Sequence, residues 1–390
     1  MLRFHTAGES HGQALVAWVA GLPAGIPVDI SFINRELKRR QEGYGRGGRM
    51  KIESDQAEIL SGVRRSKTTG APIALLIANR DWENWKDALP VEEQESTAQK
   101  YKSLTSPRPG HADLAGCLKY NLHEARLVLE RASARESAAR VAAGAMAKLL
   151  LGQFGIEVLS HVIAVGNVYA KNLATWEQIK EVCAQNDILL RCVDSPTELK
   201  MKAAVDEVLR SGDSLGGIFE VVAHNVPPGL GTHANWDERL DGLLAQAVMS
   251  LQAVKAVEIG TGIESAVSLG SQVHDEIDYD RKEQRFVRPA NHAGGLEGGI
   301  SNGEDVVVRG YLKPISTLRR PLQSVDLETK EPVKAAYERS DVCVVPAAGV
   351  AAEAMVALVL ARCSLEKFGG DSLEETRRNF ENYMEQVRTF

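Results

Sequence analysis

Three long runs of small residues constrain the fold of this chain more than any other feature. They are rich in alanine and predict helices over 125–151, 236–256 and 347–363. Small side chains let helix backbones approach closely, so we expect these helices to be buried together between sheets. Stretches rich in β-branched residues predict strands at 14–20, 73–77, 158–168, 218–223, 257–262 and 306–311. Residues 372–387 predict an amphipathic, solvent-facing helix.

A weak internal repeat suggests that the chain has two similar halves. The glycine turn Gly8-Glu-Ser-His-Gly12 aligns with Gly212-Asp-Ser-Leu-Gly216, and 141–146 aligns with 350–355 at a nearly equal offset. This predicts one domain over 1–390 whose halves, about 1–200 and 201–390, are related by a pseudo-twofold axis. The first turn carries His11 where the second has Leu215, so the turn itself does not require a histidine. His11 is therefore a candidate for chemistry.

Residues 35–51 form a basic, glycine-rich segment in an otherwise acidic chain. The formal net charge is −6, so a cluster of cations must serve a local purpose. We expect a short helix over 34–41 capped by Asn34, then a glycine loop over 43–49. Arginines on such a loop can converge on one anion, which predicts a site for a small, multiply anionic ligand. The cations are Arg35, Lys38, Arg39, Arg40, Arg46, Arg49 and Lys51.

The glycine-rich and basic segments also resemble other known motifs. Gly43, Gly45 and Gly48 match GxGxxG, but a polar helix rather than a strand precedes them. Residues 62–68 resemble a P-loop in which Ser66 replaces the glycine before lysine. A charge run is usually a solvated surface, although such surfaces rarely interleave glycines with arginines. Non-catalytic binding of an anion or RNA stays the alternative from a different functional class.

Cysteine usage and hydropathy indicate the cellular setting. The five cysteines form no CxxC pair, so we expect reduced, mostly buried thiols and no structural zinc. The first residues lack the pattern of a signal peptide. The longest apolar stretches, such as 347–361, are interrupted by Gly349 and Glu353 and are expected to fall short of a membrane span. These features predict a cytoplasmic protein that binds neither membrane nor nucleic acid.

Three later segments carry further polar candidates. His111 lies in a Pro/Gly loop between Arg108 and Asp113, a setting suited to acid–base work near neutral pH. Residues 291–303 form a glycine-rich loop, and 313–317 offer a lysine and two hydroxyls to a phosphate. Residues 339–341 are the triplet Arg-Ser-Asp. Each is weak alone, since such loops are more often plain turns or caps.

Taken together, the motifs resemble the chorismate synthase family over nearly the whole chain. The segments that carry the resemblance are 5–12, 39–55, 108–113, 131–136, 293–303, 313–317 and 339–341. The resemblance implies an α+β fold, a β-α-β sandwich with a helical layer between two antiparallel sheets. It implies a lyase of the shikimate pathway that eliminates phosphate from 5-enolpyruvylshikimate 3-phosphate in a 1,4-anti sense. It also implies a requirement for reduced FMN without net redox change, and a homotetramer.

The resemblance also assigns roles to individual residues. His11 would be the acid beside the departing phosphate, His111 would manage a proton near the flavin, and Asp341 would help the flavin N5 accept the hydrogen lost from the substrate. The implied substrate-binding residues are Ser10, Arg40, Arg46, Arg49, Arg135 and Arg339. The implied FMN-binding residues are Arg131, Ala132, Ser133, Gln252, Ala253, Gly298, Lys313, Pro314, Ile315, Ser316, Thr317 and Arg339. Arg35, Lys38 and Arg39 are then expected on the helix surface or as charges at the entrance of the site.

Ala132 departs from the family pattern, in which a serine is common at this position. If the serine hydroxyl binds FMN, the change lowers the affinity for FMN, whereas a contact through the backbone is unaffected. NADPH is expected only indirectly, for flavin reduction. Because no reductase segment is visible, an external flavin reductase is the expected supplier of electrons. A flavin oxidoreductase with net hydride transfer is the second alternative.

Overall fold

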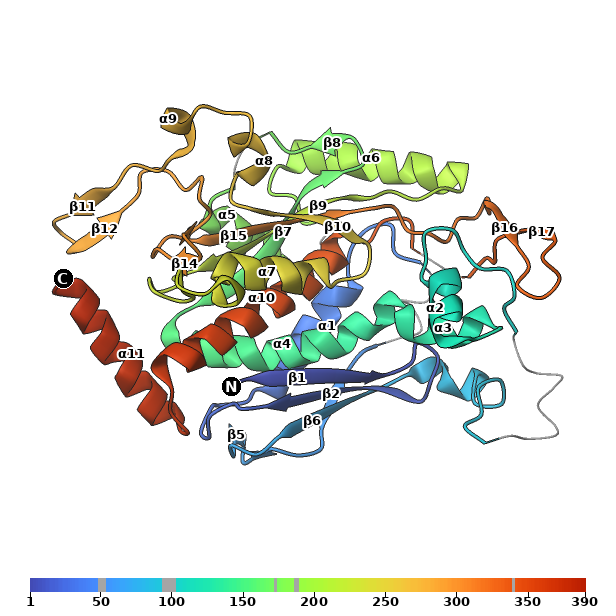
Figure 1. Cartoon of the computed structure of the whole chain (residues 1–390), viewed down its shortest axis with the longest axis horizontal. Helices are drawn as coiled ribbons and strands as arrows, with labels where there is room; N and C mark the ends of the chain where they lie inside the picture. The colour runs from blue at the N-terminus through green and yellow to red at the C-terminus, as the bar shows by residue number, and fades with distance from the viewer. Residues whose placement is uncertain (48–53, 93–102, 172–173, 186–188, 339–340) are drawn as a thin grey trace.

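Two antiparallel sheets flank a set of buried helices (Figure 1). The computed structural model describes residues 1–47, 54–92, 103–171, 174–185, 189–338 and 341–390. The first sheet has the order β1-β2-β6-β3, formed by Arg3–Gly8, Ala14–Ala20, Ile73–Ala78 and Ala57–Ile59. The second has the order β10-β15-β9-β7-β8, formed by Val254–Ile259, Val306–Leu312, Gly217–His224, Glu157–Val165 and Val168–Tyr169. The prediction of a mixed helix-and-strand fold is confirmed.

Successive side chains of a strand point to opposite faces, and in β2 one face is turned toward the helices. Leu15, Ala17 and Val19 are buried on that face, whereas the apolar residues between them are half-buried on the opposite face. Helix α4 (Ser137–Leu151) packs on β2 and β6, and α10 (Val345–Phe368) packs on β7 and β9. The two helices also pack on each other and on α1 (Ile30–Gln41).

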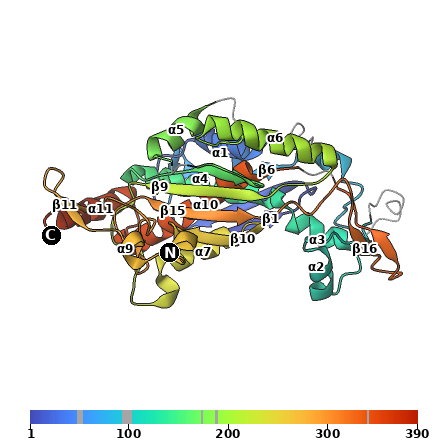
Figure 2. The ribbon, with the colours of Figure 1, turned by 90° about the horizontal axis from the view of Figure 1, so that it is seen from above.

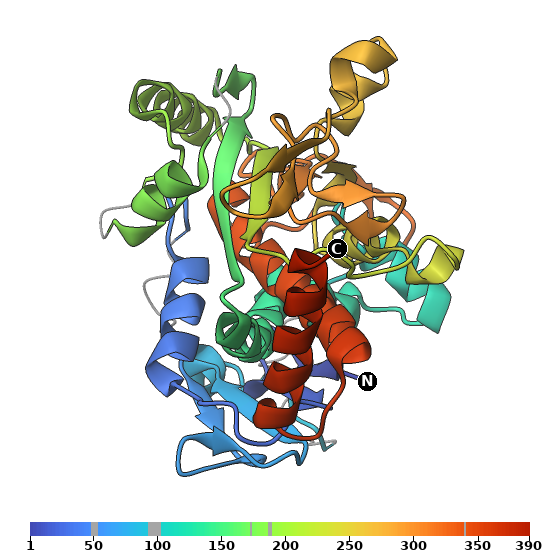
Figure 3. The ribbon, with the colours of Figure 1, turned by 90° about the vertical axis from the view of Figure 1, so that its left-hand side faces the viewer.

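The remaining elements surround this body (Figures 1 and 2). The other helices are α2 (Asp113–Tyr120), α3 (Ala125–Ala132), α5 (Trp176–Ala184), α6 (Ser195–Ser211), α7 (Leu240–Met249), α8 (Gly262–Ser265), α9 (Gly270–Val273) and α11 (Leu373–Arg388). The short hairpins are β4–β5 (Val63–Arg64, Lys67–Thr68), β11–β12 (Asp278–Asp280, Arg285–Val287), β13–β14 (Leu296–Glu297, Ile300–Ser301) and β16–β17 (Gln323–Val325, Pro332–Lys334). Short 3-10 turns are η2 (Arg80–Asn84), η3 (Ala134–Glu136), η4 (Gly152–Phe154) and η5 (Trp236–Glu238). Helix α11 lies across one end of the helical layer, where Phe380 packs on Phe154 and Phe368 (Figure 3).

Helices α4 and α10 approach most closely at Gly144. A Cβ atom there would lie 2.3 Å from Cβ and 2.5 Å from Cα of Ala354, distances that a side chain cannot occupy. The contact therefore depends on the absence of a side chain, in line with the close approach expected from the alanine-rich runs. The contact joins residues 141–146 and 350–355, the two segments of the second repeat pair. The pseudo-twofold axis stays a prediction, and superposing the two halves of the chain tests it.

We expect Gly144→Ala to lower the free energy of unfolding by about 1–3 kcal/mol, because overpacking at a helix contact outweighs the better helix propensity of alanine. Chemical denaturation measures the change. Gly152 is the matched control, because it ends the same helix and has no atom within 4 Å of a built Cβ. Gly152→Ala should leave stability unchanged or slightly raised, and equal losses in both variants would contradict the packing argument.

A buried ionic cluster in the helical layer corrects two expectations. Arg39 is not on the surface: it is 9% exposed and donates to Glu353 at 2.7 and 2.8 Å and to Glu36 at 2.8 Å. Glu353 does not interrupt its helix either. Among the described residues, α10 is the one helix long and apolar enough to cross a membrane, but 78% of its most apolar window is buried inside the protein. The expectation that this stretch is too short was therefore wrong, because the helix continues through both Gly349 and Glu353, and pairing with Arg39 and Lys148 lets Glu353 be buried there.

Several predicted boundaries also differ from the structure. The first alanine-rich run breaks at Ser133, whose hydroxyl accepts from the backbone nitrogen of Arg135, and resumes as α4. The second ends early, since α7 stops at Met249 and Ala253 takes a left-handed φ of 69° before β10. Helix α1 begins earlier than predicted, with Asp29 rather than Asn34 as its N-cap. All five cysteines are free, as predicted.

Candidate active site

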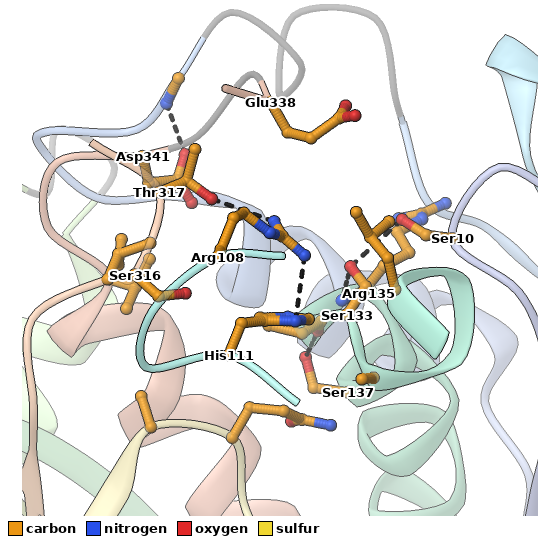
Figure 4. A pocket seen from close by; sticks show the side chains of 18 of the residues that line it. Ser10, Arg108, His111, Ser133, Arg135, Ser137, Ser316, Thr317, Glu338 and Asp341 are labelled. Carbon is orange, nitrogen blue, oxygen red and sulfur yellow. Dashed lines mark hydrogen bonds between the residues drawn. The ribbon is translucent and has the colours of Figure 1, made fainter. Parts of the chain in front are cut away.

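A cavity of about 940 Å³ opens between the two sheets, at the end of the molecule that carries α2, α3 and the β16–β17 hairpin (Figures 1 and 4). Its wall combines segments far apart in the sequence: the turn after β1, the loop before α2, the break between α3 and α4, the loop after β15 and the start of α10. Most predicted site residues line it. They are Ser10, His11, Arg40, Arg46, His111, Ala132, Ser133, Arg135, Gln252, Ala253, Lys313, Pro314, Ile315, Ser316, Thr317 and Asp341.

Four predicted site residues are not among those that line the cavity. Arg49 and Arg339 lie outside the described residues. Arg131 is directed to the edge of β1, where it donates to the Thr6 carbonyl at 2.9 Å and the Gly8 carbonyl at 3.2 Å. Gly298 lies in the β13–β14 turn with a φ of 60°. The cofactor roles assigned to Arg131 and Gly298 stay predictions.

One carboxylate holds two arginines in place on the cavity wall. Asp55 accepts from Arg40 at 2.6 Å and from Arg135 at 2.6 Å, and its side chain has no exposed surface. Burial opposes its ionisation, but the two guanidinium groups outweigh burial and hold the pKa of Asp55 below its usual value. Arg135 also donates to Asn79 Oδ1 at 2.8 Å. Burial and the neighbouring arginines lower the pKa of Arg40 to about 10. These cations are oriented before any ligand binds.

His11 is held by α3 and by an aromatic ring. Its backbone nitrogen donates to Glu130 Oε2 at 2.8 Å, and its Nδ1 lies 2.9 Å from Glu130 Oε1. The imidazole stacks on the indole of Trp85 with a centroid separation of 4.0 Å. Arg126 lies over Trp85, 5.3 Å from its ring centroid. His11 is one of the residues that line the cavity.

His111 has a different carboxylate partner. Its Nδ1 lies 2.5 Å from Asp113 Oδ1, and Arg108 donates to Asp113 Oδ2 at 2.8 Å. Arg108 also donates to the Thr317 hydroxyl at 3.0 Å (Figure 4). Burial opposes ionisation of Asp113, yet the hydrogen bonds from His111 and Arg108 hold its pKa well below its usual value. The loop over 108–113 is thus fixed by its own side chains and by the strand-end loop of Thr317.

The basic glycine loop meets the start of α10 through Asp341. Arg46 pairs with Asp341 Oδ2 at 2.9 Å, and the backbone nitrogen of Gly47 donates to Asp341 Oδ1 at 2.5 Å. On the opposite side of the loop, the hydroxyl of Tyr44 donates to Asp206 on α6. The described part of the loop is therefore tied at both ends, which places Arg46 in the cavity wall.

The charge and polarity of the lining indicate the kind of ligand. Among the described lining residues, six cations face three carboxylates, although the chain as a whole is acidic. The cations are Arg40, Arg46, Arg108, Arg126, Arg135 and Lys313. One wall is apolar and is formed by Leu129, Leu251, Leu312, Val344, Ala347, Ala348 and Ala351. Partial burial and the nearby Lys255 lower the pKa of Lys313, which donates to the Gly110 carbonyl. This combination suits a flat, anionic cofactor next to an anionic substrate.

Several residues of the site were not found from the sequence. Trp85, Arg126 and Glu130 were given no role from the sequence, and Asp55, although it ends the segment 39–55, was not assigned its pairing with Arg135, because the partners concerned are distant in sequence. Glu130 is 119 residues from His11, so only the folded chain brings them together. Arg108 and Asp113, which flank His111 in the sequence, contact each other and the His111 ring, and the acid–base role of His111 stays a prediction.

Comparisons with known proteins agree on the family. The chorismate synthase family model matches residues 2–365. The chain is 66% identical to the chorismate synthase of Koribacter versatilis and 53% identical to that of Aquifex aeolicus, in each case over 100% of this chain and at least 99% of the relative. A crystal structure of chorismate synthase, 42% identical, superposes with a TM-score of 0.79 and covers 100% of this chain and 99% of its own. The chain belongs to the chorismate synthase family.

Proposed function

We propose that this enzyme makes chorismate in the shikimate pathway, by 1,4-anti elimination of phosphate from 5-enolpyruvylshikimate 3-phosphate. It is then a carbon–oxygen lyase acting on a phosphate. The observation that carries the proposal is the surplus of fixed cations around a cavity that also holds two histidines paired with carboxylates. Family membership supports the same assignment.

The substrate carries two carboxylates and a phosphate, so it needs several convergent cations. Arg40, Arg46 and Arg135 would bind these anions, with Ser10 beside them and Arg49 and Arg339 added from outside the described residues. Asp55 fixes Arg40 and Arg135 through two 2.6 Å bonds, so little reorganisation is needed on binding. Positioned guanidinium groups also stabilise the negative charge that develops as phosphate leaves.

His11 would supply the proton that the departing phosphate takes up. In the overall reaction one ring C–H bond and the allylic C–O bond break, a new double bond forms, and phosphate leaves. A proton at His11 Nε2 lies on the cavity side, because Nδ1 faces Glu130. Asp341 and His111 would hold protons elsewhere in the cavity. Asp341 already pairs with Arg46, and His111 lies within hydrogen-bond distance of Asp113.

The cavity also fits reduced FMN. Its volume of about 940 Å³ is near the upper end of the roughly 300–1,000 Å³ range of small-molecule pockets, which leaves room for a cofactor beside a substrate. Ala132, Ser133, Gln252, Ala253 and the segment Lys313–Thr317 would hold it against the apolar wall. When bound, reduced FMN supplies the electron density that assists C–O cleavage and ends the reaction in the same redox state. The assigned contacts of Arg131, Gly298 and Arg339 are further parts of this proposal.

Reductant stoichiometry tests the proposal against a flavin oxidoreductase. With FMN reduced once under anaerobic conditions, we expect many molecules of chorismate and phosphate per flavin and no continuing consumption of NADPH. NADPH would then serve only for flavin reduction, by an external reductase. Consumption of one NADPH per product would instead assign net hydride transfer. Absence of any phosphate release would favour a non-catalytic anion-binding protein.

The fuller fold and assembly assignments belong to the same proposal. They are a β-α-β sandwich with a pseudo-twofold axis, a homotetramer, and action in the cytoplasm on a small-molecule substrate. Several large apolar side chains are exposed in the single chain around α8, α9 and the β11–β12 hairpin, which supports assembly. They include Ile263, Val267, Leu269, Ile277, Tyr279 and Phe286.

A further inference from the structure

We propose that Glu130 is a positioning residue that fixes the orientation and tautomer of His11 for proton donation to the leaving phosphate. The inference rests on the proposed function, because it assigns a role within that reaction. Glu130 itself does not line the cavity and would act only through His11.

Glu130 contacts both the backbone and the side chain of His11. Oε2 accepts from the backbone nitrogen of His11 at 2.8 Å, and Nδ1 of the same residue lies 2.9 Å from Oε1 and 3.1 Å from Oε2. The Glu130 carbonyl also accepts from the Ser10 backbone nitrogen at 2.9 Å. Backbone and ring are thus fixed together, which is more than a hydrogen bond to the imidazole alone would achieve.

Glu130 decides which imidazole nitrogen carries a proton. The side chain is almost fully buried, and burial opposes its ionisation, but the hydrogen bonds and charge of His11 together with Arg126 outweigh burial and hold the pKa of Glu130 below its usual value. An ionised carboxylate only accepts hydrogen bonds, so Nδ1 must be the donor. Among the described residues, no group hydrogen-bonds Nε2. The cavity-facing nitrogen therefore stays available for a ligand oxygen.

Trp85 completes the constraint by fixing the ring plane. Its indole is stacked on the imidazole with a centroid separation of 4.0 Å and an interplanar angle of 26°, and Trp85 as a whole residue is 7% exposed. The imidazole cannot flip to exchange its two nitrogens without leaving both the stack and Glu130. After Nε2 gives its proton to a phosphate oxygen, the neutral ring keeps its proton on Nδ1, where Glu130 accepts from it. No bond to Glu130 forms or breaks in the step.

A double-mutant cycle distinguishes positioning from a general structural role. We expect Glu130→Gln to lower kcat by about 100-fold, as loss of an orienting carboxylate does in other histidine-dependent sites, and to change KM by less than about threefold. In a His11→Ala background the same substitution should lower kcat by less than about twofold, because its effect passes through His11. Equal losses of kcat in both backgrounds would overturn the proposal.

A spectroscopic readout makes the test independent of turnover. In protein labelled with ¹⁵N-histidine, the Nδ1-bound proton of His11 should give a low-field resonance that is absent from His11→Ala and shifted or lost in Glu130→Gln. An unchanged resonance in Glu130→Gln would overturn the proposal. If Glu130→Gln does not fold, Glu130→Asp is the replacement variant, which keeps the carboxylate but shortens the side chain by one methylene. We expect its kcat to lie between those of wild type and Glu130→Gln. A wild-type kcat would contradict the inference.

These experiments distinguish a failure of the role proposed for Glu130 from a failure of the proposed function. If the wild-type enzyme releases no phosphate from the substrate with reduced FMN, the reaction assignment fails, although the resonance still tests the Glu130–His11 pair. If the wild-type enzyme is active and the cycle is additive, only the role of Glu130 fails.

Discussion

Replacing Glu353 by alanine should lower the free energy of unfolding by about 3–5 kcal/mol, because it leaves buried cations without their main partner. Glu353 has no exposed surface and accepts from Arg39 at 2.7 and 2.8 Å, from Lys148 at 2.5 Å and from the Ser160 hydroxyl at 2.6 Å. After its removal, Glu36 would be the one carboxylate, among the residues that the structure describes, still paired with both cations. Urea denaturation at neutral pH measures the change.

Glu366→Ala is the matched control on the same helix. Glu366 pairs with Arg362 at 2.8 Å, but both side chains are 37% exposed, so its loss should change stability by less than about 1 kcal/mol. Similar losses in both variants would mean that the buried cluster contributes no more than a surface pair.

The Glu353 cluster should also make stability depend on pH in a defined direction. Burial opposes ionisation of Glu353, but Arg39 and Lys148 outweigh burial and lower its pKa below the ordinary value of 4.5. A carboxyl whose pKa is lowered on folding contributes stability that is present above the unfolded pKa and lost as the pH falls through the folded pKa. The advantage of wild type over Glu353→Gln should therefore be full at pH 7 and shrink below pH 4.5.

His11→Ala should lower kcat by about 100- to 10,000-fold with a much smaller change in KM, since it removes the proton donor and leaves the arginines that bind the anions in place. The methyl group that replaces the imidazole cannot donate to phosphate, whereas Arg40 and Arg135 keep their bonds to Asp55. Steady-state kinetics with reduced FMN in excess measures both constants.

His274→Ala is the control for removing a histidine without touching the cavity. His274 is exposed at the end of α9 and is not a lining residue, so kcat and KM should both stay near wild type. If His11→Ala raised KM as strongly as it lowered kcat, His11 would be a ligand contact rather than a proton donor.

The sequence predicted elements well where one local pattern decides them. Strand β2 has the predicted bounds because an unbroken apolar run extends through Ala14–Ala20 and Gly21 follows it. Prediction was wrong where tertiary contacts override composition. Ser133 interrupts an alanine-rich run so that Ser133 and Arg135 reach the cavity. Residues 254–256, at the end of the second predicted helix, belong to β10 and pair with β15.

The sequence predicted residues of the candidate site, but it did not predict which of them contact one another. Family motifs identify His11, His111 and Asp341, whereas nothing in the sequence links His11 to Glu130 or Arg135 to Asp55. Arg39 shows the same limit. It adjoins Arg40 in a basic run, yet successive helix positions face different directions, and Arg39 pairs with Glu353 while Arg40 pairs with Asp55.

The most direct test follows phosphate and chorismate together in an anaerobic reaction of 5-enolpyruvylshikimate 3-phosphate with photoreduced FMN, using wild type and His11→Ala in parallel. We predict that wild type releases one phosphate per chorismate over many turnovers of the same flavin, and that the variant, saturated with both ligands, does so at least about 100-fold more slowly. No phosphate from wild type, or equal rates from the two proteins, would contradict the assignment of this cavity.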